Sequence, residues 1–163
     1  APNKHLLKNS KKLIILKAFT KLYGMAGARL GYCLCSDTEL LARMRAAGQP
    51  WAVSSLAQAA GIAALDETEY VAKVRALIEA QRPVLADGLR ALGLRVIEGR
   101  ANYLLFCAPE ALGEALRRKG AVLRSCGNYP GLDASWYRTA VRTENENRQL
   151  LALLAETLPE VAQ

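Results

Sequence analysis

The sequence has few aromatic residues, one histidine and no long apolar run, and each shortage argues against a class of protein. Aromatic residues make up 6% of the chain, too few for the interleaved basic and aromatic pattern that stacks nucleic-acid bases. No apolar run approaches the roughly 18 residues of a membrane-spanning helix. Because His5 is the only histidine, no zinc ligand set of usual spacing can be assembled. We therefore expect no metal, membrane or nucleic-acid partner.

The opening segment APNKHLLKNSKK is polar and basic and lacks the apolar core of a secretion signal, so we expect a cytoplasmic protein. The four cysteines have apolar, strand-like neighbours, which favours reduced, buried thiols over a disulfide scaffold; they are Cys33, Cys35, Cys107 and Cys126. The net charge is +7. We interpret the basic residues as spread along helices, with solvated faces and a few arginines that bind anions.

Hydrophobic periodicity predicts an α/β chain that ends in a small α+β module. We expect strands at 12–17, 29–35, 94–99, 102–108, 121–126 and 136–142, and helices at 36–47, 54–65, 67–92, 110–120 and from 143 onward. Ser36 or Asp37 should cap the first helix, and Thr143 with Glu146 should form a capping box. Pro83 should kink the long helix.

These elements predict three parts: residues 1–66 as the end of a large domain, 67–93 as a linking helix, and 94–163 as a small domain with helices packed on a small sheet. The helix over 54–65 is rich in alanine and is predicted to be buried. The first two strands have no obvious partners within the chain if they are central parallel strands. We therefore expect the chain to be the later portion of something longer.

The segment KAFTKLYGMAGARLGY, residues 17–32, places Lys21 just past the first predicted strand and Arg29 eight residues later, among glycines. An arbitrary lysine is most often a solvated surface residue. A lysine at a strand end, beside a cation and flexible backbone, can instead form an imine with an aldehyde. The neighbouring arginine could hold a phosphate through two parallel hydrogen bonds.

This segment resembles the lysine segment of pyridoxal-phosphate (PLP) enzymes of fold type I, in the class I/II aminotransferase group. The resemblance implies that Lys21 binds the cofactor aldehyde and that Thr20 and Arg29 hold its phosphate. One departure is Ala18, where many relatives carry a serine hydroxyl. A phosphate contact is therefore missing here or supplied elsewhere.

The resemblance continues to the last predicted helix. GRANYLLF is similar to the family's strand entry and carries Asn102, and WYRTAVRTENEN is similar to its last strand, where Arg138 would bind the substrate α-carboxylate. The segment VLRSCGNYPGLDASWYR is similar to threonine-phosphate decarboxylases of cobalamin biosynthesis. On that match Arg124 would bind the substrate phosphate, and Asn128 would shape the pocket. Two alternatives stay open for the neighbouring residues. Tyr129 and Trp136 either line the pocket or are packing residues. Arg142 either assists phosphate binding or is a surface residue.

The resemblance thus implies a C-terminal part of a PLP-dependent enzyme that acts on a small phosphorylated amino acid and is a homodimer when full length. Threonine-phosphate decarboxylase is the favoured activity, and histidinol-phosphate aminotransferase or another class I/II aminotransferase is the alternative. The isolated chain should be inactive, because the aspartate that pairs with the cofactor ring precedes the lysine segment in the relatives. A non-enzymatic hypothesis is a basic module that binds anions or nucleic acid.

Overall fold

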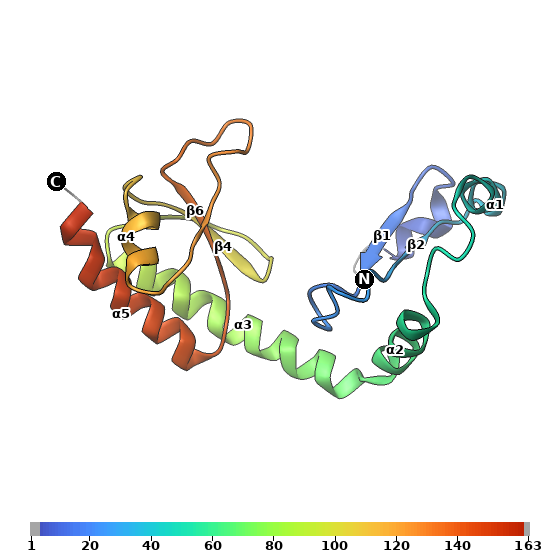
Figure 1. The fold of residues 1–163 in the computed structure, drawn as a ribbon, viewed down its shortest axis with the longest axis horizontal. Helices are drawn as coiled ribbons and strands as arrows, with labels where there is room; N and C mark the ends of the chain where they lie inside the picture. Colours follow the sequence, from blue (N-terminus) through green and yellow to red (C-terminus); the bar gives the residue numbers. More distant parts are fainter. Residues whose placement is uncertain (1–3, 162–163) are drawn as a thin grey trace. The chain divides into compact units, whose positions relative to one another are not determined.

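The computed structural model describes residues 4–161 and divides the chain into two compact units, Ala1–Val71 and Ala72–Gln163 (Figure 1). The division falls within the first turns of one long helix, α3 (Thr68–Ala91). Both units mix helices with strands, as the sequence predicted for a chain of the α/β class, and the strands pair in antiparallel fashion. The three-part division at residues 66 and 93 stays a prediction.

Unit 1 contains a short 3-10 helix, a two-stranded sheet and two helices. Its elements are η1 (Lys4–Asn9), β1 (Ile15–Ala18), β2 (Gly31–Leu34), α1 (Thr38–Ala47) and α2 (Ser55–Asp66). The two strands pair with each other in antiparallel register, with Lys17 opposite Tyr32 and Ala18 opposite Gly31. The expectation that these strands lack partners within the chain was wrong, because each is paired along one edge.

The helices of unit 1 begin where side-chain capping predicts. The Asp37 carboxylate accepts a hydrogen bond from the backbone N–H of Leu40 at 2.9 Å, which caps α1. The Ser54 hydroxyl accepts one from Ala57 N–H at 3.2 Å, which caps α2. Each cap satisfies one of the unpaired N–H groups at a helix start.

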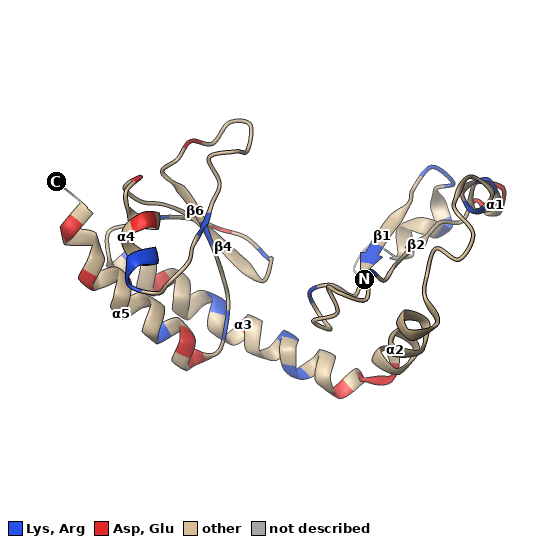
Figure 2. Cartoon of the chain, viewed as in Figure 1, with Lys and Arg blue, Asp and Glu red and all other residues tan. Residues whose placement is uncertain are grey.

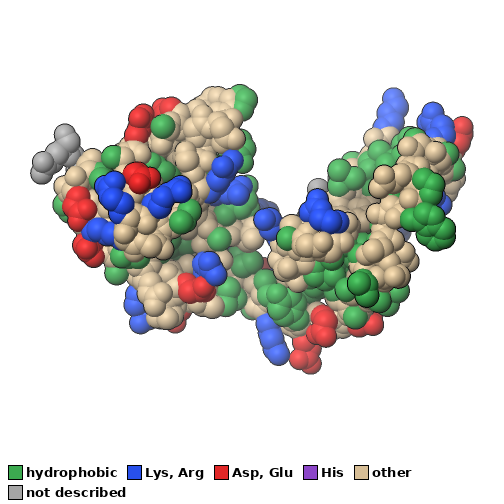
Figure 3. All heavy atoms as spheres, viewed as in Figure 1, with side chains coloured by type: hydrophobic (Ala, Val, Ile, Leu, Met, Phe, Trp, Pro, Cys, Tyr) green, Lys and Arg blue, Asp and Glu red, His purple; other side chains and the backbone are tan. Residues whose placement is uncertain are grey.

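The helix α2 is not buried as its alanine-rich sequence predicted. Its small residues Ala57, Gly61 and Ala64 face inward, whereas Leu56 on its outer side is 83% exposed. Strand β1 shows the same pattern, because Leu16 is 76% exposed. Hydrophobic side chains accordingly lie open on the surface of this unit (Figure 3). The apolar pattern of α2 was identified correctly, but its large apolar side chains are exposed and only its small residues are buried.

Unit 2 is built on a four-stranded antiparallel sheet of order β3-β4-β6-β5. Its elements after α3 are β3 (Arg95–Ile97), β4 (Tyr103–Cys107), α4 (Leu112–Arg118), β5 (Arg124–Ser125), β6 (Trp136–Ala140) and α5 (Glu144–Val161). One face of the sheet joins the helices in a single core, whose members include Leu85, Leu89, Leu104, Phe106, Leu112, Leu116, Tyr137 and Leu154. This is the small module of helices on a sheet that the sequence predicted. The strand predicted over 121–126 is shorter than expected, because only Arg124–Ser125 pairs.

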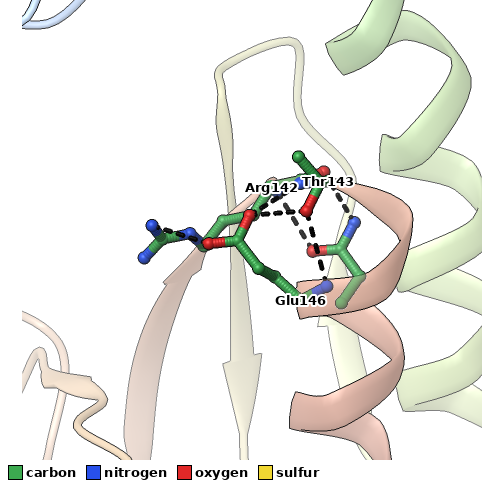
Figure 4. Close-up of polar contacts among 4 residues, drawn as sticks. Arg142, Thr143 and Glu146 are labelled. Atoms are coloured by element: carbon green, nitrogen blue, oxygen red, sulfur yellow. Dashed lines mark hydrogen bonds and ion pairs between the residues drawn. The ribbon is translucent and has the colours of Figure 1, made fainter.

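The start of α5 is fixed by the predicted capping box (Figure 4). The Thr143 backbone N–H and hydroxyl both donate to the Glu146 carboxylate, at 3.2 and 2.6 Å. These bonds hold the pKa of Glu146 below its ordinary value. The neighbouring Arg142 guanidinium forms an ion pair with the same carboxylate at 2.8 Å. Buried Asn147 bonds the backbone N–H and C=O of Arg142 and also donates to Gln81 of α3.

Charge is less evenly spread than the sequence interpretation held. Residues 1–35 contain seven of the 22 basic residues and none of the 15 acidic ones. The β1–β2 part of the ribbon accordingly carries Lys and Arg but no Asp or Glu (Figure 2). The remaining 128 residues have equal numbers of basic and acidic residues. The net charge of the chain therefore arises from its first 35 residues.

All four cysteines are free thiols, as predicted, but only Cys126 is buried and the other three are half-buried. Among residues 4–161, no helix is long and apolar enough to cross a membrane.

Candidate functional site

The loop that carries Lys21 begins where β1 ends. Residues 19–30 connect Ala18 to Gly31, two residues that face each other across the antiparallel pair. Lys21 lies exposed in the first turn of this loop, and its backbone carbonyl accepts from Gly24 N–H at 3.3 Å. Within the described part of the chain, its ammonium group has no carboxylate within ion-pair distance. The geometry thus presents an unneutralised primary amine at a strand end, next to half-buried Thr20.

Phe19 anchors this loop. Its side chain is 4% exposed, and its ring lies 5.2 Å from the ring of Tyr23 and 5.9 Å from that of Tyr32. Its backbone N–H donates to Leu30 O at 3.2 Å, and its carbonyl accepts from Met25 N–H. These contacts fix both ends of the loop around one aromatic side chain. Lys21 is therefore held two residues from a buried anchor.

Arg29 lies in the same loop, as the sequence predicted. Its backbone has a φ of 51°, a left-handed conformation that is uncommon for a residue with a side chain. Its guanidinium donates one hydrogen bond, to Ala26 O at 3.2 Å. No carboxylate of the described residues pairs with it, so most of its donors are available to an anion.

Gly31 sets the close approach of β1 and β2 at the base of the loop. A Cβ atom at this position would lie 2.9 Å from the backbone carbonyl oxygen of Lys17. The glycine therefore lets the two strands pair directly below Lys21 and Arg29.

In unit 2, the two arginines predicted to bind substrate face each other on neighbouring strands. Arg124 of β5 is the register partner of Arg138 of β6, so both side chains lie on the same face of the sheet. This is the face opposite the one that contributes Leu104, Phe106 and Tyr137 to the core. Like charges placed directly opposite each other destabilise a sheet. An anion bound between the two guanidinium groups would remove that cost.

Aromatic rings hold both guanidinium groups. The Arg138 Cζ atom lies 4.5 Å from the centre of the Tyr103 ring, and the Arg124 Cζ atom lies 6.0 Å from that of Tyr129. The Asn128 side-chain oxygen accepts from Arg124 at 3.2 Å. Neither arginine forms an ion pair within the residues that the structure describes. Cation–π contacts orient a guanidinium without neutralising it.

The turn between β5 and β6 keeps this pair in register. The Cys126 N–H donates to Trp136 O at 2.8 Å, and Asp133 accepts from the backbone N–H of Ser135 at 3.0 Å and from its hydroxyl. These bonds lower the pKa of the Asp133 carboxyl. Gly127 allows a close approach here, since a Cβ atom would lie 3.1 Å from Ala134 Cα.

The structure brings together the predicted residues within each unit. Lys21, Thr20 and Arg29 share one loop, and Arg124, Asn128 and Arg138 share one region of the sheet. Asn102 immediately precedes β4, and its backbone carbonyl accepts from Val141 N–H at 2.9 Å, beside the strand of Arg138. Sequence reasoning missed Tyr103, whose contact with Arg138 depends on the pairing of β4 with β6. Across residues 4–161 no group of three His, Cys, Asp or Glu side chains could hold a metal ion.

Comparison with known proteins places this arrangement in a family. The family model described as "Aminotransferase class I and II" matches residues 1–154. The chain is 38% identical over 160 residues to threonine-phosphate decarboxylase of Salmonella typhimurium, covering 96% of the chain and 44% of that protein. It is also 38% identical over 158 residues to histidinol-phosphate aminotransferase of Symbiobacterium thermophilum, covering 95% and 43%.

Solved structures agree with this assignment. The crystal structure of histidinol-phosphate aminotransferase from Clostridium acetobutylicum matches with a TM-score of 0.90 and 30% identity, over 96% of this chain and 48% of that one. The enzyme of the same name from Sinorhizobium meliloti, solved in complex with pyridoxal-5'-phosphate, matches with a TM-score of 0.72 and 26% identity, over 93% and 41%.

The chain spans less than half the length of the curated relatives that it matches. The match nevertheless extends over nearly all of its own residues and includes both the lysine loop and the paired arginines. The chain belongs to the class I and II aminotransferase family.

Proposed function

We propose that this chain is part of a PLP-dependent enzyme in which Lys21 binds the cofactor aldehyde. The observation that carries the proposal is the loop in which Lys21 and Arg29 occur together, with both cations free of carboxylate partners among the described residues. The residues fit the group: Arg29 has donors for the cofactor phosphate, and the Thr20 hydroxyl can add another. When bound, PLP would supply an electron sink for the bond that breaks at the substrate α-carbon.

We further propose that the substrate is a small phosphorylated amino acid, with O-phospho-L-threonine as the favoured candidate. It carries a carboxylate and a phosphate, and unit 2 presents two opposed arginines for two anionic groups. Arg138 would hold the carboxylate and Arg124 the phosphate, while Asn128 and Asn102 would shape the site. Held at both ends, the substrate would have a fixed position in the site. The resemblance of residues 122–138 to threonine-phosphate decarboxylases favours decarboxylation as the reaction.

Histidinol-phosphate aminotransferase activity is the second candidate, because a relative of that name is equally identical to the chain. Histidinol phosphate has a phosphate but no carboxylate, so it would use only one of the two arginines. In that reaction the freed Lys21 amine would move the proton at the α-carbon.

The experiment is an assay of the full-length protein with each substrate. We expect carbon dioxide from O-phospho-L-threonine, and we expect Lys21→Ala to lose both this activity and the visible absorbance of the bound cofactor. Amino transfer from histidinol phosphate without carbon dioxide would favour the second candidate. A cofactor absorbance that survives Lys21→Ala would contradict the proposal as a whole.

The remaining parts of the proposal follow the same resemblance. The full-length protein would be a cytoplasmic homodimer of cobalamin biosynthesis, and the isolated 163-residue chain would be inactive. The non-enzymatic hypothesis is a basic module that binds anions or nucleic acid, motivated by the net charge of +7. A DNA-binding titration separates the two, since a nucleic-acid module would bind at physiological ionic strength with a steep salt dependence.

A further inference from the structure

The open face of the sheet in unit 2 carries a third arginine beyond the two assigned to substrate. Arg95 of β3, Cys107 of β4 and Trp136 of β6 are register partners in one row across the sheet. The neighbouring row contains Leu105, Arg138 and Arg124. Both rows lie on the same side of the sheet, because residues two apart along a strand share a face. Arg95 therefore belongs to the same surface as the proposed substrate site.

Arg95 is held in the same way as the other two arginines. The Arg95 Cζ atom lies 5.5 Å from the centre of the Trp136 ring. Cation–π contacts of significant strength occur about once per 70–80 residues in proteins, whereas this one surface has three. Each of its arginines is thus oriented by a ring: Arg95 by Trp136, Arg124 by Tyr129 and Arg138 by Tyr103.

The three arginines of this surface lack carboxylate partners among the described residues, as do Arg75, Arg82, Arg100 and Arg118 elsewhere in unit 2. Four arginines elsewhere in unit 2 form ion pairs with Asp or Glu, namely Arg90, Arg117, Arg142 and Arg148. Among the described residues, none of the three on the open face does. The strand positions of this face contain no acidic residue. The surface is therefore complementary to several anionic groups at once.

We propose that Arg95, held over Trp136, is a third oxyanion-binding position on the open face of the β3-β4-β6-β5 sheet. Trp136 lies two residues from Arg138 along β6, which corresponds to about 7 Å. A ligand whose anionic groups occupy Arg124 and Arg138 could thus place a further phosphate or carboxylate at Arg95. The site would select ligands that extend beyond O-phospho-L-threonine. This inference does not require Lys21 or a cofactor.

Tryptophan fluorescence of the 163-residue chain tests the site directly. The chain has two tryptophans, and Trp51 is 97% exposed, so Trp51→Phe leaves Trp136 as the reporter at small structural cost. We expect a saturable change in Trp136 emission on titration with inorganic phosphate, at ionic strength held constant with sodium chloride. Acetate in place of phosphate distinguishes carboxylate binding from phosphate binding.

Arg95→Gln in the Trp51→Phe background should weaken this binding at least about tenfold, because it removes charge-assisted hydrogen bonds. Arg118→Gln is the matched control, since it removes an exposed cation of the same unit that lies on α4 and outside the open face of the sheet, and it should leave the Trp136 response in place. Side-chain NMR of the Arg95 Nε–H group gives a second readout that does not depend on emission. Absence of saturable phosphate binding by both readouts, or unchanged binding in Arg95→Gln, would overturn the proposal.

Discussion

The two units of this chain differ in how completely they bury their own apolar residues. All of the largest fully buried side chains belong to unit 2, from Leu85 to Thr157, and none belongs to the described part of unit 1. The most exposed large apolar residues belong to unit 1, among them Trp51, Leu56 and Leu16. Exposed apolar patches of this kind are typical of surfaces that contact another protein, a membrane or a ligand. Unit 2 thus has its own buried core, whereas unit 1 leaves large apolar side chains exposed.

This difference agrees with the proposed roles of the two units, in which unit 1 binds the cofactor through Lys21 and unit 2 binds the substrate through its arginines. Unit 2 holds its arginines on a sheet that its own helices support. Unit 1 holds Lys21 on a two-stranded ribbon, and such a ribbon is marginally stable alone. We expect the substrate-binding half of the proposed site to keep its structure in the isolated chain more firmly than the lysine loop does.

The largest expected effect comes from the core of unit 2. Phe106 is fully buried between the sheet and the helices, so Phe106→Ala should lower the free energy of unfolding by about 3–5 kcal/mol. Leu56→Ala on the exposed side of α2 is the matched control in unit 1 and should change it by less than about 0.5 kcal/mol. Urea unfolding followed by circular dichroism measures both. Equal losses in the two variants would remove the contrast between the units.

A smaller effect is expected at the base of the lysine loop. Gly31→Ala would place a Cβ atom 2.9 Å from the Lys17 carbonyl oxygen, and we expect this to destabilise the β1–β2 pair by about 1–3 kcal/mol. Hydrogen exchange of the β1 and β2 amides should report the loss locally. Gly27→Ala is the control, since nothing lies within 4 Å of the added atom. Faster exchange in the Gly27 variant than in the Gly31 variant would contradict the assigned role.

The contact of Tyr103 with Arg138 should have a more modest effect on ligand binding. Tyr103→Leu removes the ring below the guanidinium, and loss of about 0.5–1 kcal/mol corresponds to a two- to fivefold weaker affinity for O-phospho-L-threonine. Tyr103→Phe keeps the ring and should retain the affinity. Calorimetric titration of the full-length protein measures both variants. An equal loss in Tyr103→Phe would indicate that the hydroxyl group, not the ring, matters.

The smallest effect concerns the capping box of α5. The folded-state pKa of Glu146 is lowered by its bonds to Thr143, so its contribution to stability is present above the unfolded value of 4.5 and is lost as the pH falls through the folded value. Glu146→Gln should flatten the decline of the urea midpoint below about pH 4.5. Glu144→Gln, on the same helical turn, is the control. A steeper decline in the Glu146 variant would reverse the predicted sign.

Local features of this fold could be read from the sequence, and non-local ones could not. Helix starts at Asp37 and Thr143 were predicted correctly because a capping side chain acts on amides two or three residues away. The antiparallel pairing of β1 with β2 was missed because register depends on partners far along the chain. The exposure of α2 was missed for a related reason. An apolar side chain suggests burial, but the sequence does not specify which residues would bury it.

The same distinction between local and non-local features applies to the candidate site. The motifs indicated Lys21, Arg29, Arg124 and Arg138 as chemically important, and the resemblance supplied their expected roles. The register that sets Arg124 opposite Arg138 emerged only from the structure, as did the rings beneath these arginines. The contact of Arg138 with Tyr103 joins residues on two different strands, so no spacing in the sequence specifies it.

The most direct measurement of the central claim is chemical trapping of the cofactor on the full-length protein. The protein would be incubated with pyridoxal phosphate and reduced with borohydride, and the modified lysine would be identified by peptide mass spectrometry. The account predicts one phosphopyridoxyl group per chain, on Lys21, and its loss in Lys21→Arg. Modification spread over the other exposed lysines, with Lys21 unlabelled, would contradict it.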